Sequence, residues 1–96
     1  MRTRYIVAYD IADDRRWRAV YKIMRGHGDR VQYSVFRCDL AATEKALFMQ
    51  ALIPLLDHSE DQVLFIDIGP ADGRGADCIE SIGQPYVAPQ RGPIIV

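Results

Sequence analysis

The sequence predicts a single α+β domain in which helices lie on one face of an antiparallel sheet. Three observations support this fold class. Two apolar runs have the length of strands, amphipathic stretches have the length of helices, and a further extended segment lies between them. With 96 residues, of which 49% are apolar, the chain has the size and composition of one folded domain.

The first predicted strand spans Arg4 to Ile11. Its side chains alternate between two faces, with Tyr5, Val7, Tyr9 and Ile11 on one face and Ile6, Ala8 and Asp10 on the other. Because both faces are mostly apolar, we expect a central strand. Asp10 is the exception, since a strand seldom carries a carboxylate among apolar residues without a use for it.

A helix is expected from an N-cap at Asp13 to about Gly26. The spacing i, i+3, i+4, i+7 predicts a core-facing stripe of Trp17, Val20, Tyr21 and Met24. A basic row lies roughly opposite and consists of Arg15, Arg18, Lys22 and Arg25. This row suits either a nucleic-acid backbone or a solvated helix face, and the spacing alone leaves both interpretations open.

The remaining segments complete the pattern. Residues 30–40 are extended, either as one long strand or as two short strands split by a bulge. A second helix begins near Thr43, and Pro54 within its apolar pattern predicts a kink or a fresh turn. A strand at residues 63–68 and a short strand at residues 78–82 follow. Residues 1–82 therefore form the predicted domain.

Residues 83–96 form a predicted C-terminal extension. Pro85, Pro89 and Pro93 exclude a helix and confine any strand to a sheet edge. The apolar end, residues 94–96, is a candidate for docking on a second subunit. A single layer of helices would also leave the other face of the sheet exposed to water, so we expect two copies to associate sheet to sheet.

Charge is distributed unevenly along the chain. The net charge is -1, but residues 1–40 hold nine Arg and Lys against five Asp and Glu, and residues 41–96 hold three against eight. A basic first half is expected of a phosphate-binding surface. No apolar run approaches the ~20 residues of a membrane span, and no secretion signal is evident, so we expect a cytoplasmic protein. Cys38 and Cys78 lack metal-ligand spacing and are expected to be reduced.

An acid at a strand end, with arginines gathered after it, suits a metal ion and phosphate. The alternative is that Asp10 is only a cap or turn residue, because Asp favours turns. Asp13 and Asp14 are expected to be charges at a helix N-terminus. His27 and His58 lie in polar stretches without the neighbours of a catalytic base, so we expect both at the surface.

These residues resemble a known family, the small universal CRISPR-associated spacer-acquisition proteins, also called CRISPR-associated endoribonucleases. The resemblance rests on the strand end Tyr9-Asp10-Ile11, the arginine-rich helix start, Gly28, the run Arg30-Val31-Gln32-Tyr33-Ser34-Val35-Phe36, Ile82-Gly83, and the tail Gly92-Pro93-Ile94-Ile95-Val96. It implies a ferredoxin-like βαββαβ fold with a further C-terminal strand. It also implies a symmetric homodimer that works with the CRISPR integrase.

The resemblance further implies a metal-dependent nuclease site at the dimer seam, with Asp10 as the metal-binding acid. The matching supporting positions are Tyr9, Arg16, Arg30, Ser34 and Phe36. Mg²⁺ or Mn²⁺ prefers several oxygen ligands, so a twofold axis near Asp10 would unite two carboxylates in one site. Arg16 and Arg30 would hold phosphate oxygens through their forked donors. Phe36 and Tyr9 would stack on bases or, alternatively, belong to the core.

Four functions remain open at this point. The first is a metal-dependent endonuclease for RNA or DNA. The second is a non-catalytic scaffold that bridges integrase dimers and holds duplex DNA. A toxin-like messenger-RNA interferase of the same fold is the third, and a ferredoxin-like ligand-binding regulator, which would need an apolar pocket, is the fourth.

Overall fold

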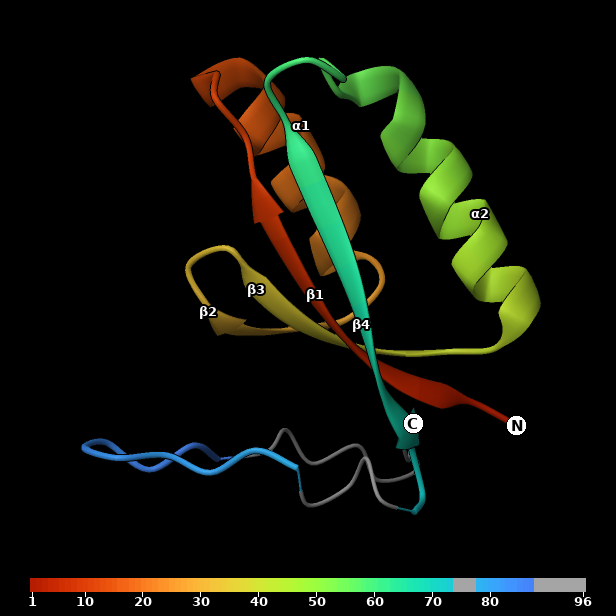
Figure 1. Cartoon of the computed structure of the whole chain (residues 1–96), viewed down its shortest axis with the longest axis vertical. Coiled ribbons are helices and arrows are strands. Elements are labelled where there is room, and N and C mark those ends of the chain that lie inside the picture. The colour runs from red at the N-terminus through yellow and green to blue at the C-terminus, as the bar shows by residue number, and fades with distance from the viewer. Residues whose placement is uncertain (74–77, 88–96) are drawn as a thin grey trace, which may run out of the picture.

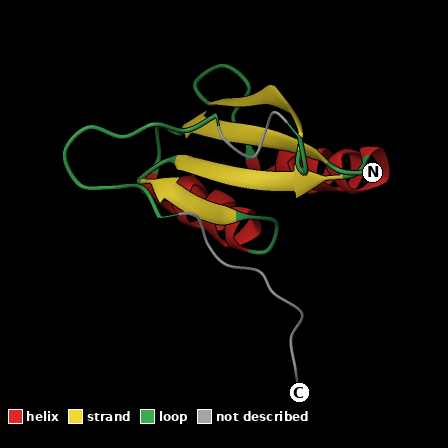
Figure 2. Cartoon of the chain, turned by 90° about the horizontal axis from the view of Figure 1, so that it is seen from below, coloured by secondary structure: helices red, strands yellow, loops and turns green. Residues whose placement is uncertain are grey.

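A computed structural model of the chain describes residues 1–73 and 78–87. Its elements, in chain order, are β1 (Thr3–Asp10), α1 (Asp14–Arg25), β2 (Asp29–Gln32), β3 (Val35–Leu40), α2 (Ala42–Leu52), the short 3-10 helix η1 (Ile53–Leu55) and β4 (Gln62–Pro70). Figures 1 and 2 show α1 and α2 on the same side of the sheet. The predicted α+β class and helix arrangement are confirmed.

The four strands form one antiparallel sheet in the order β2-β3-β1-β4. Val7 at the middle of β1 pairs with Phe36 of β3 on one side and with Phe65 of β4 on the other. The prediction that the first strand is internal to the sheet is therefore confirmed, as is the ferredoxin-like arrangement. The two edge strands are β2 and β4.

The extended segment at residues 30–40 divides into two strands. A turn at Tyr33 and Ser34 separates β2 from β3, and Gln32 pairs with Val35 across it. The register also shifts between Arg30 and Gln32. Of the two arrangements that the sequence left open, the structure has the two short strands.

Local sequence explains where the helices begin and end. The Asp13 side chain caps α1 by accepting hydrogen bonds from the backbone N–H of Arg15 and of Arg16, both at 3.0 Å. At the other helix, α2 ends at Leu52, and Pro54 lies in the separate turn of η1. Pro54 cannot donate a backbone hydrogen bond, so the predicted fresh turn follows directly.

The core lies between the sheet and the helices. Its buried members are Val7, Tyr9, Val20, Met24, Phe36, Cys38, Leu40, Phe48 and Leu52. Val20 and Met24 of the predicted helix stripe are fully buried, whereas Trp17 and Tyr21 are half-buried at its border. Cys38 packs in this core as a small apolar side chain.

The predicted strand at residues 78–82 is wrong. Residues 78–87 form no regular element, because no strand of the described sheet pairs with them. Of the C-terminal extension at residues 83–96, which is predicted to dock on a second subunit, residues 88–96 lie outside the described residues. Over the part of the chain that the structure describes, no helix is both long and apolar enough to cross a membrane.

Candidate active site and its basic surroundings

Asp10 is the last residue of β1 and is exposed to solvent. It pairs with Gln62 at the start of β4. Because side chains alternate along a strand and Val7 and Tyr9 point into the core, Asp10 lies on the face of the sheet that carries no helix. The strand thus delivers one carboxylate to the open face of the sheet at its end.

A single chain offers little else for a metal ion. Among residues 1–73 and 78–87, no group of three or more His, Cys, Asp or Glu side chains could hold one. The carboxylate of Asp13 is occupied by the cap of α1. Magnesium and manganese ions bind carboxylate oxygens, so the Asp10 side chain is a suitable ligand. A second carboxylate would bind such an ion more tightly than Asp10 alone.

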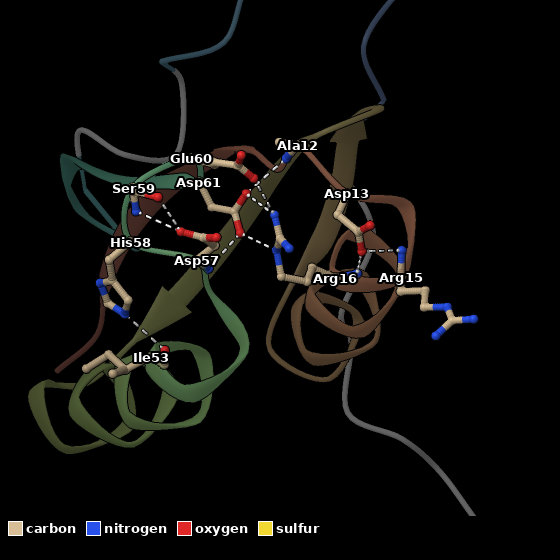
Figure 3. A network of polar contacts seen from close by, with 10 residues as sticks. All are labelled: Ala12, Asp13, Arg15, Arg16, Ile53, Asp57, His58, Ser59, Glu60 and Asp61. Atoms are coloured by element: carbon tan, nitrogen blue, oxygen red, sulfur yellow. Dashed lines mark hydrogen bonds and ion pairs between the residues drawn. The ribbon is translucent and has the colours of Figure 1, made fainter.

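The Arg16 side chain is 28% exposed, and its guanidinium points toward the carboxylates of Asp61 and Glu60, as Figure 3 shows. Its Nε atom donates to Oδ2 of Asp61 at 2.8 Å, and its Nη2 atom donates to Oδ1 of Asp61 at 3.3 Å and to Oε2 of Glu60 at 3.2 Å. These hydrogen bonds raise the pKa of Arg16. The expectation that Arg16 holds phosphate stays a prediction, and in this structure two of its three guanidinium nitrogens already donate to Asp61 and Glu60.

Asp61 is the centre of this network and its side chain is fully buried. Besides Arg16, it accepts the backbone N–H of Ala12 at 2.9 Å and that of Asp57 at 2.8 Å. The hydrogen bond from Arg16, followed by those from the two backbone groups, keeps the pKa of Asp61 well below its usual range. Asp61 therefore ties the loop after Asp10 to the loop before β4.

This role of Asp61 was not predicted from the sequence. It lies in the stretch His58-Ser59-Glu60-Asp61, which has the composition of an ordinary polar turn. The partners Arg16 and Asp61 are 45 positions apart, so no local pattern links them. Only the antiparallel pairing of β1 with β4 brings the two loops together.

Ser34 and Tyr9 take part in packing next to the strand end. Ser34 accepts the backbone N–H of Tyr9 at 3.0 Å through its carbonyl and the indole N–H of Trp17 at 3.2 Å through its hydroxyl. The Tyr9 hydroxyl is buried and has no hydrogen-bond partner among the described residues. Burial raises its pKa, while the charge of Arg30 and the nearby Ser34 hydroxyl oppose that rise.

The expectation that Phe36 contacts nucleic acid is wrong for this conformation. Its ring is only 1% exposed and is covered by the rings of Tyr9 and Tyr21 at centroid distances of 6.3 and 5.8 Å. The alternative that Phe36 belongs to the core therefore holds. The residue pairs with Val7 across β1 and β3, which directs its ring toward the helices.

The predicted basic row is exposed throughout, at Arg15, Arg18, Lys22 and Arg25. In Figure 3, the Arg15 side chain points away from the network around Asp61. Arg30 is exposed as well, on β2, and donates to the Gln32 carbonyl at 3.4 Å. These cations are accessible for phosphate oxygens, whereas Arg16 is only 28% exposed and already donates to Asp61 and Glu60.

The two histidines differ. His58 is exposed as expected, but His27 is half-buried, stacks on Phe48 at a centroid distance of 4.2 Å and has Nδ1 at 2.8 Å from the Ile23 carbonyl. The expected surface position of His27 is therefore wrong. The chain turns back over the core where α1 ends at Gly26, and this turn places the His27 imidazole against Phe48.

The helix border also carries an aromatic stack that the sequence did not reveal. Trp17 stacks on Tyr21 at a centroid distance of 5.1 Å and on Tyr33 at 4.8 Å. The guanidinium of Arg30 lies 5.7 Å from the Tyr21 ring and 5.6 Å from the Tyr33 ring. The spacing of Trp17 and Tyr21 predicts that both lie on one face of α1, but no local sequence pattern predicts that Tyr33 contacts them.

Comparison with known proteins gives a consistent result. The family model described as CRISPR associated protein Cas2 matches residues 1–73. A protein of Rhodospirillum rubrum named CRISPR-associated endoribonuclease Cas2 1 is 41% identical over 92 residues, which cover 96% of this chain and 89% of the relative. A protein of Geobacter sulfurreducens named CRISPR-associated endoribonuclease Cas2 is 39% identical over 92 residues, 96% of each chain.

Solved structures share the fold. A hypothetical protein of Thermus thermophilus superposes with a TM-score of 0.78 at 28% identity, covering 91% of this chain and 98% of its own. Streptococcus pyogenes Cas2 superposes with a TM-score of 0.70 at 27% identity, covering 83% of this chain and 99% of its own. The likeness thus extends from sequence to the arrangement of strands and helices.

Proposed function

The chain belongs to the CRISPR-associated Cas2 family, and on this premise we propose that it is a CRISPR adaptation protein whose homodimer carries a metal-dependent endonuclease site. The observation that carries the proposal is the exposed carboxylate of Asp10 at the end of β1, on the helix-free face of the sheet. The bonds cut would be phosphodiesters of RNA or DNA. The names of the relatives, which are CRISPR-associated endoribonucleases, support this reaction class.

Two copies of Asp10 would form the metal site. One chain supplies one carboxylate, and a twofold axis beside the end of β1 would supply the second. Mg²⁺ or Mn²⁺ fits such oxygen ligands. When bound, the ion supplies positive charge for a phosphoryl oxygen and lowers the pKa of a coordinated water.

The surrounding residues position the site and its substrate. Asp61 holds Ala12, two residues beyond Asp10, by a 2.9 Å hydrogen bond, and Arg16 holds Asp61 in turn. The exposed guanidinium of Arg30 and the basic row of α1 would bind the phosphate backbone through charge-assisted hydrogen bonds. Arg16 thus acts as a positioning residue, and Arg30 as a substrate contact.

The open face of the sheet supports the homodimer. Leu64 and Ile66 of β4 are 44% and 46% exposed, and they pair with Ala8 and Ile6 of β1 on the same face. An apolar sheet face on a small domain is favourable to cover. A second copy placed there would bring a second Asp10 toward the first, since β1 carries both the apolar residues and the acid.

Cleavage of labelled single-stranded RNA and of duplex DNA tests the nuclease proposal. Wild type, Asp10→Asn and Asp72→Asn are compared with Mg²⁺, with Mn²⁺ and with chelator. Asp72→Asn is the matched control, because Asp72 is also exposed but follows the far end of β4. We expect metal-dependent cutting that Asp10→Asn loses and Asp72→Asn keeps. Cutting by Asp10→Asn at the wild-type rate would contradict the proposal.

A non-catalytic scaffold is the second candidate. It is favoured by the lack, among residues 1–73 and 78–87, of a group of three or more side chains that could hold a metal ion. It is also favoured by the basic row on α1, which would hold duplex DNA while the dimer bridges two integrase dimers. Spacer acquisition by cells carrying Asp10→Asn separates the two functions. Acquisition that persists without cleavage would make the scaffold the biological role, and acquisition that is lost would make cleavage necessary.

The other two alternatives find less support. A ligand-binding regulator would need an apolar pocket, but a cavity of about 530 Å³ at the start of β1 is lined mainly by Arg, Asp and Glu side chains. Two of its arginines are held in ion pairs, Arg2 with Glu44 at 2.8 Å and Arg4 with Asp39 at 2.7 Å. The messenger-RNA interferase stays a prediction, which the gene neighbourhood would test.

A further inference from the structure

The aromatic stack at the border of the core reaches the surface at Tyr33. Tyr21 and Trp17 come from α1, and Tyr33 comes from the two-residue turn between β2 and β3. The Trp17 and Tyr33 rings are nearly parallel, at an angle of 16°, and those of Trp17 and Tyr21 at 11°. Trp17 stacks on both tyrosines and is half-buried, whereas Tyr33 is 65% exposed.

The surface ring is held in place before any ligand arrives. Trp17 donates its indole N–H to the hydroxyl of Ser34, the residue next to Tyr33, at 3.2 Å. Ser34 in turn accepts the backbone N–H of Tyr9. The turn is thus fixed to both α1 and β1, so a flat ligand that stacks on Tyr33 would lose little entropy in ordering the ring.

Arginine side chains lie beside the rings of this aromatic stack. The guanidinium of Arg30 lies 5.6 Å from the Tyr33 ring centroid, and that of Arg25 lies 5.8 Å from the Tyr21 centroid. Both arginines are exposed, and among the residues that the structure describes neither forms a salt bridge with a carboxylate. Aromatic faces flanked by accessible cations suit a nucleobase with its phosphates.

We propose that Tyr33 is a stacking platform for a base of single-stranded nucleic acid, with Arg30 and Arg25 binding the adjacent phosphates. The inference rests on the proposed function and assigns to Tyr33 the contact with an unpaired base of its substrate. Bases within a duplex stack on each other and leave no free face for Tyr33, whereas an unpaired base offers one. A base on the outer face of Tyr33 would become the fourth ring of the stack.

Binding of labelled oligonucleotides in chelator tests the platform. Fluorescence anisotropy compares a single strand of about ten nucleotides with an abasic strand of the same length and charge, and with a duplex. The proteins are wild type, Tyr33→Ala and Tyr33→Phe. We expect Tyr33→Ala to bind the base-bearing strand roughly tenfold more weakly, Tyr33→Phe to bind it like wild type, and the abasic strand and duplex to show no difference among the three proteins.

A second measurement uses Trp17, which is the only tryptophan of the chain. Base-bearing strands should change its emission in wild type, and abasic strands should not. If Tyr33→Ala weakens binding of the abasic strand as much as that of the base-bearing strand, the ring acts only through the fold of the turn, and the proposal is overturned. Unchanged affinity of Tyr33→Ala for the base-bearing strand would overturn it equally.

The design separates this inference from the nuclease proposal. The binding assay contains chelator, so its result does not depend on cleavage at Asp10. A failure of the Asp10→Asn experiment would leave the binding comparison intact. Conversely, if Tyr33 does not bind a base, the proposal that Asp10 is the centre of metal-dependent cutting still stands. Only a preference of the nuclease for single strands would then need another explanation.

Discussion

At the scale of single residues, Asp61 explains how the end of β1 is held. Its buried carboxylate accepts two hydrogen bonds from Arg16 and one each from the backbone N–H groups of Ala12 and Asp57. A buried charge without these partners would be costly, because it would lose hydration without compensation. Asp61 therefore fixes the loop that follows Asp10 without contacting a substrate itself.

Replacing Asp61 by Asn should destabilise the protein and remove part of its acid sensitivity. The lowered pKa of Asp61 means that its carboxylate stabilises the fold above its unfolded pKa of about 3.9, and that this stabilisation is lost as the pH falls below that value. Urea unfolding of wild type at pH values from about 7 to 3 measures the effect. We expect Asp61→Asn to have a lower midpoint at neutral pH and a smaller drop on acidification.

Glu60→Gln is the matched control, since Glu60 contacts the same arginine but is exposed, and exposed ion pairs contribute little. Its midpoint should stay close to that of wild type. Some acid sensitivity should persist in Asp61→Asn, because the hydrogen bond from Arg2, with that from the Ala41 N–H, lowers the pKa of Glu44 to about 2. An equal drop in midpoint on acidification for wild type and Asp61→Asn would contradict the assigned role.

At the scale of elements, the connection from α1 to β2 depends on a close backbone approach. A Cβ atom at Gly28 would collide with the carbonyl oxygen of Arg37 and would lie 2.5 Å from Sγ of Cys38. Both neighbours belong to β3, so the connection crosses directly over that strand. Gly28 is required here for space, which agrees with its place in the family resemblance.

Gly28→Ala should therefore destabilise the fold by about 1–3 kcal/mol, the range typical of overpacking. Gly26→Ala is the control, because its Cβ would approach the Ile23 carbonyl oxygen at 3.4 Å and its backbone is already in the right-handed helical region, with φ at -77°. Alanine at this position should be neutral or stabilising by up to about 1 kcal/mol. Equal unfolding free energies for the two variants, measured in urea, would contradict the crowding at Gly28.

At the scale of the whole molecule, the two faces of the sheet differ in what covers them. The helices and the core occupy one face, whereas Leu64 and Ile66 leave apolar surface on the other. The strand that carries both residues, β4, is an edge of the sheet. An apolar face beside an open edge is a site at which a second copy can associate.

Ile66→Lys should weaken self-association, because it places a charge in the apolar face proposed for the dimer. Sedimentation equilibrium of wild type and variant measures the change, and we expect the dissociation constant to rise by at least about tenfold. Leu47→Lys is the control, since Leu47 is 60% exposed but lies on α2, across the molecule from that face. A dimer weakened by Leu47→Lys and not by Ile66→Lys would place the interface on the helices instead.

The order and type of most elements could be predicted from local sequence patterns. Local stereochemistry, which depends on residues that are neighbours in the chain, explains four of these features. They are the alternation in β1, the apolar stripe of α1, the cap at Asp13 and the break at Pro54. Asp10 was recognised for the same reason, because an acid stands out against its own apolar strand. The prediction of a short strand at residues 78–82 was wrong, because a β-strand forms only where it pairs with another strand.

Which side chains meet across the molecule depends on the tertiary structure. Arg16 is held by Asp61, Phe36 is buried in the core, and Tyr33 joins Trp17 in a stack. Each of these contacts joins residues that are distant in the chain or that belong to different elements. Strand pairing and helix packing bring such residues together, and the periodicity of a single segment does not predict these contacts.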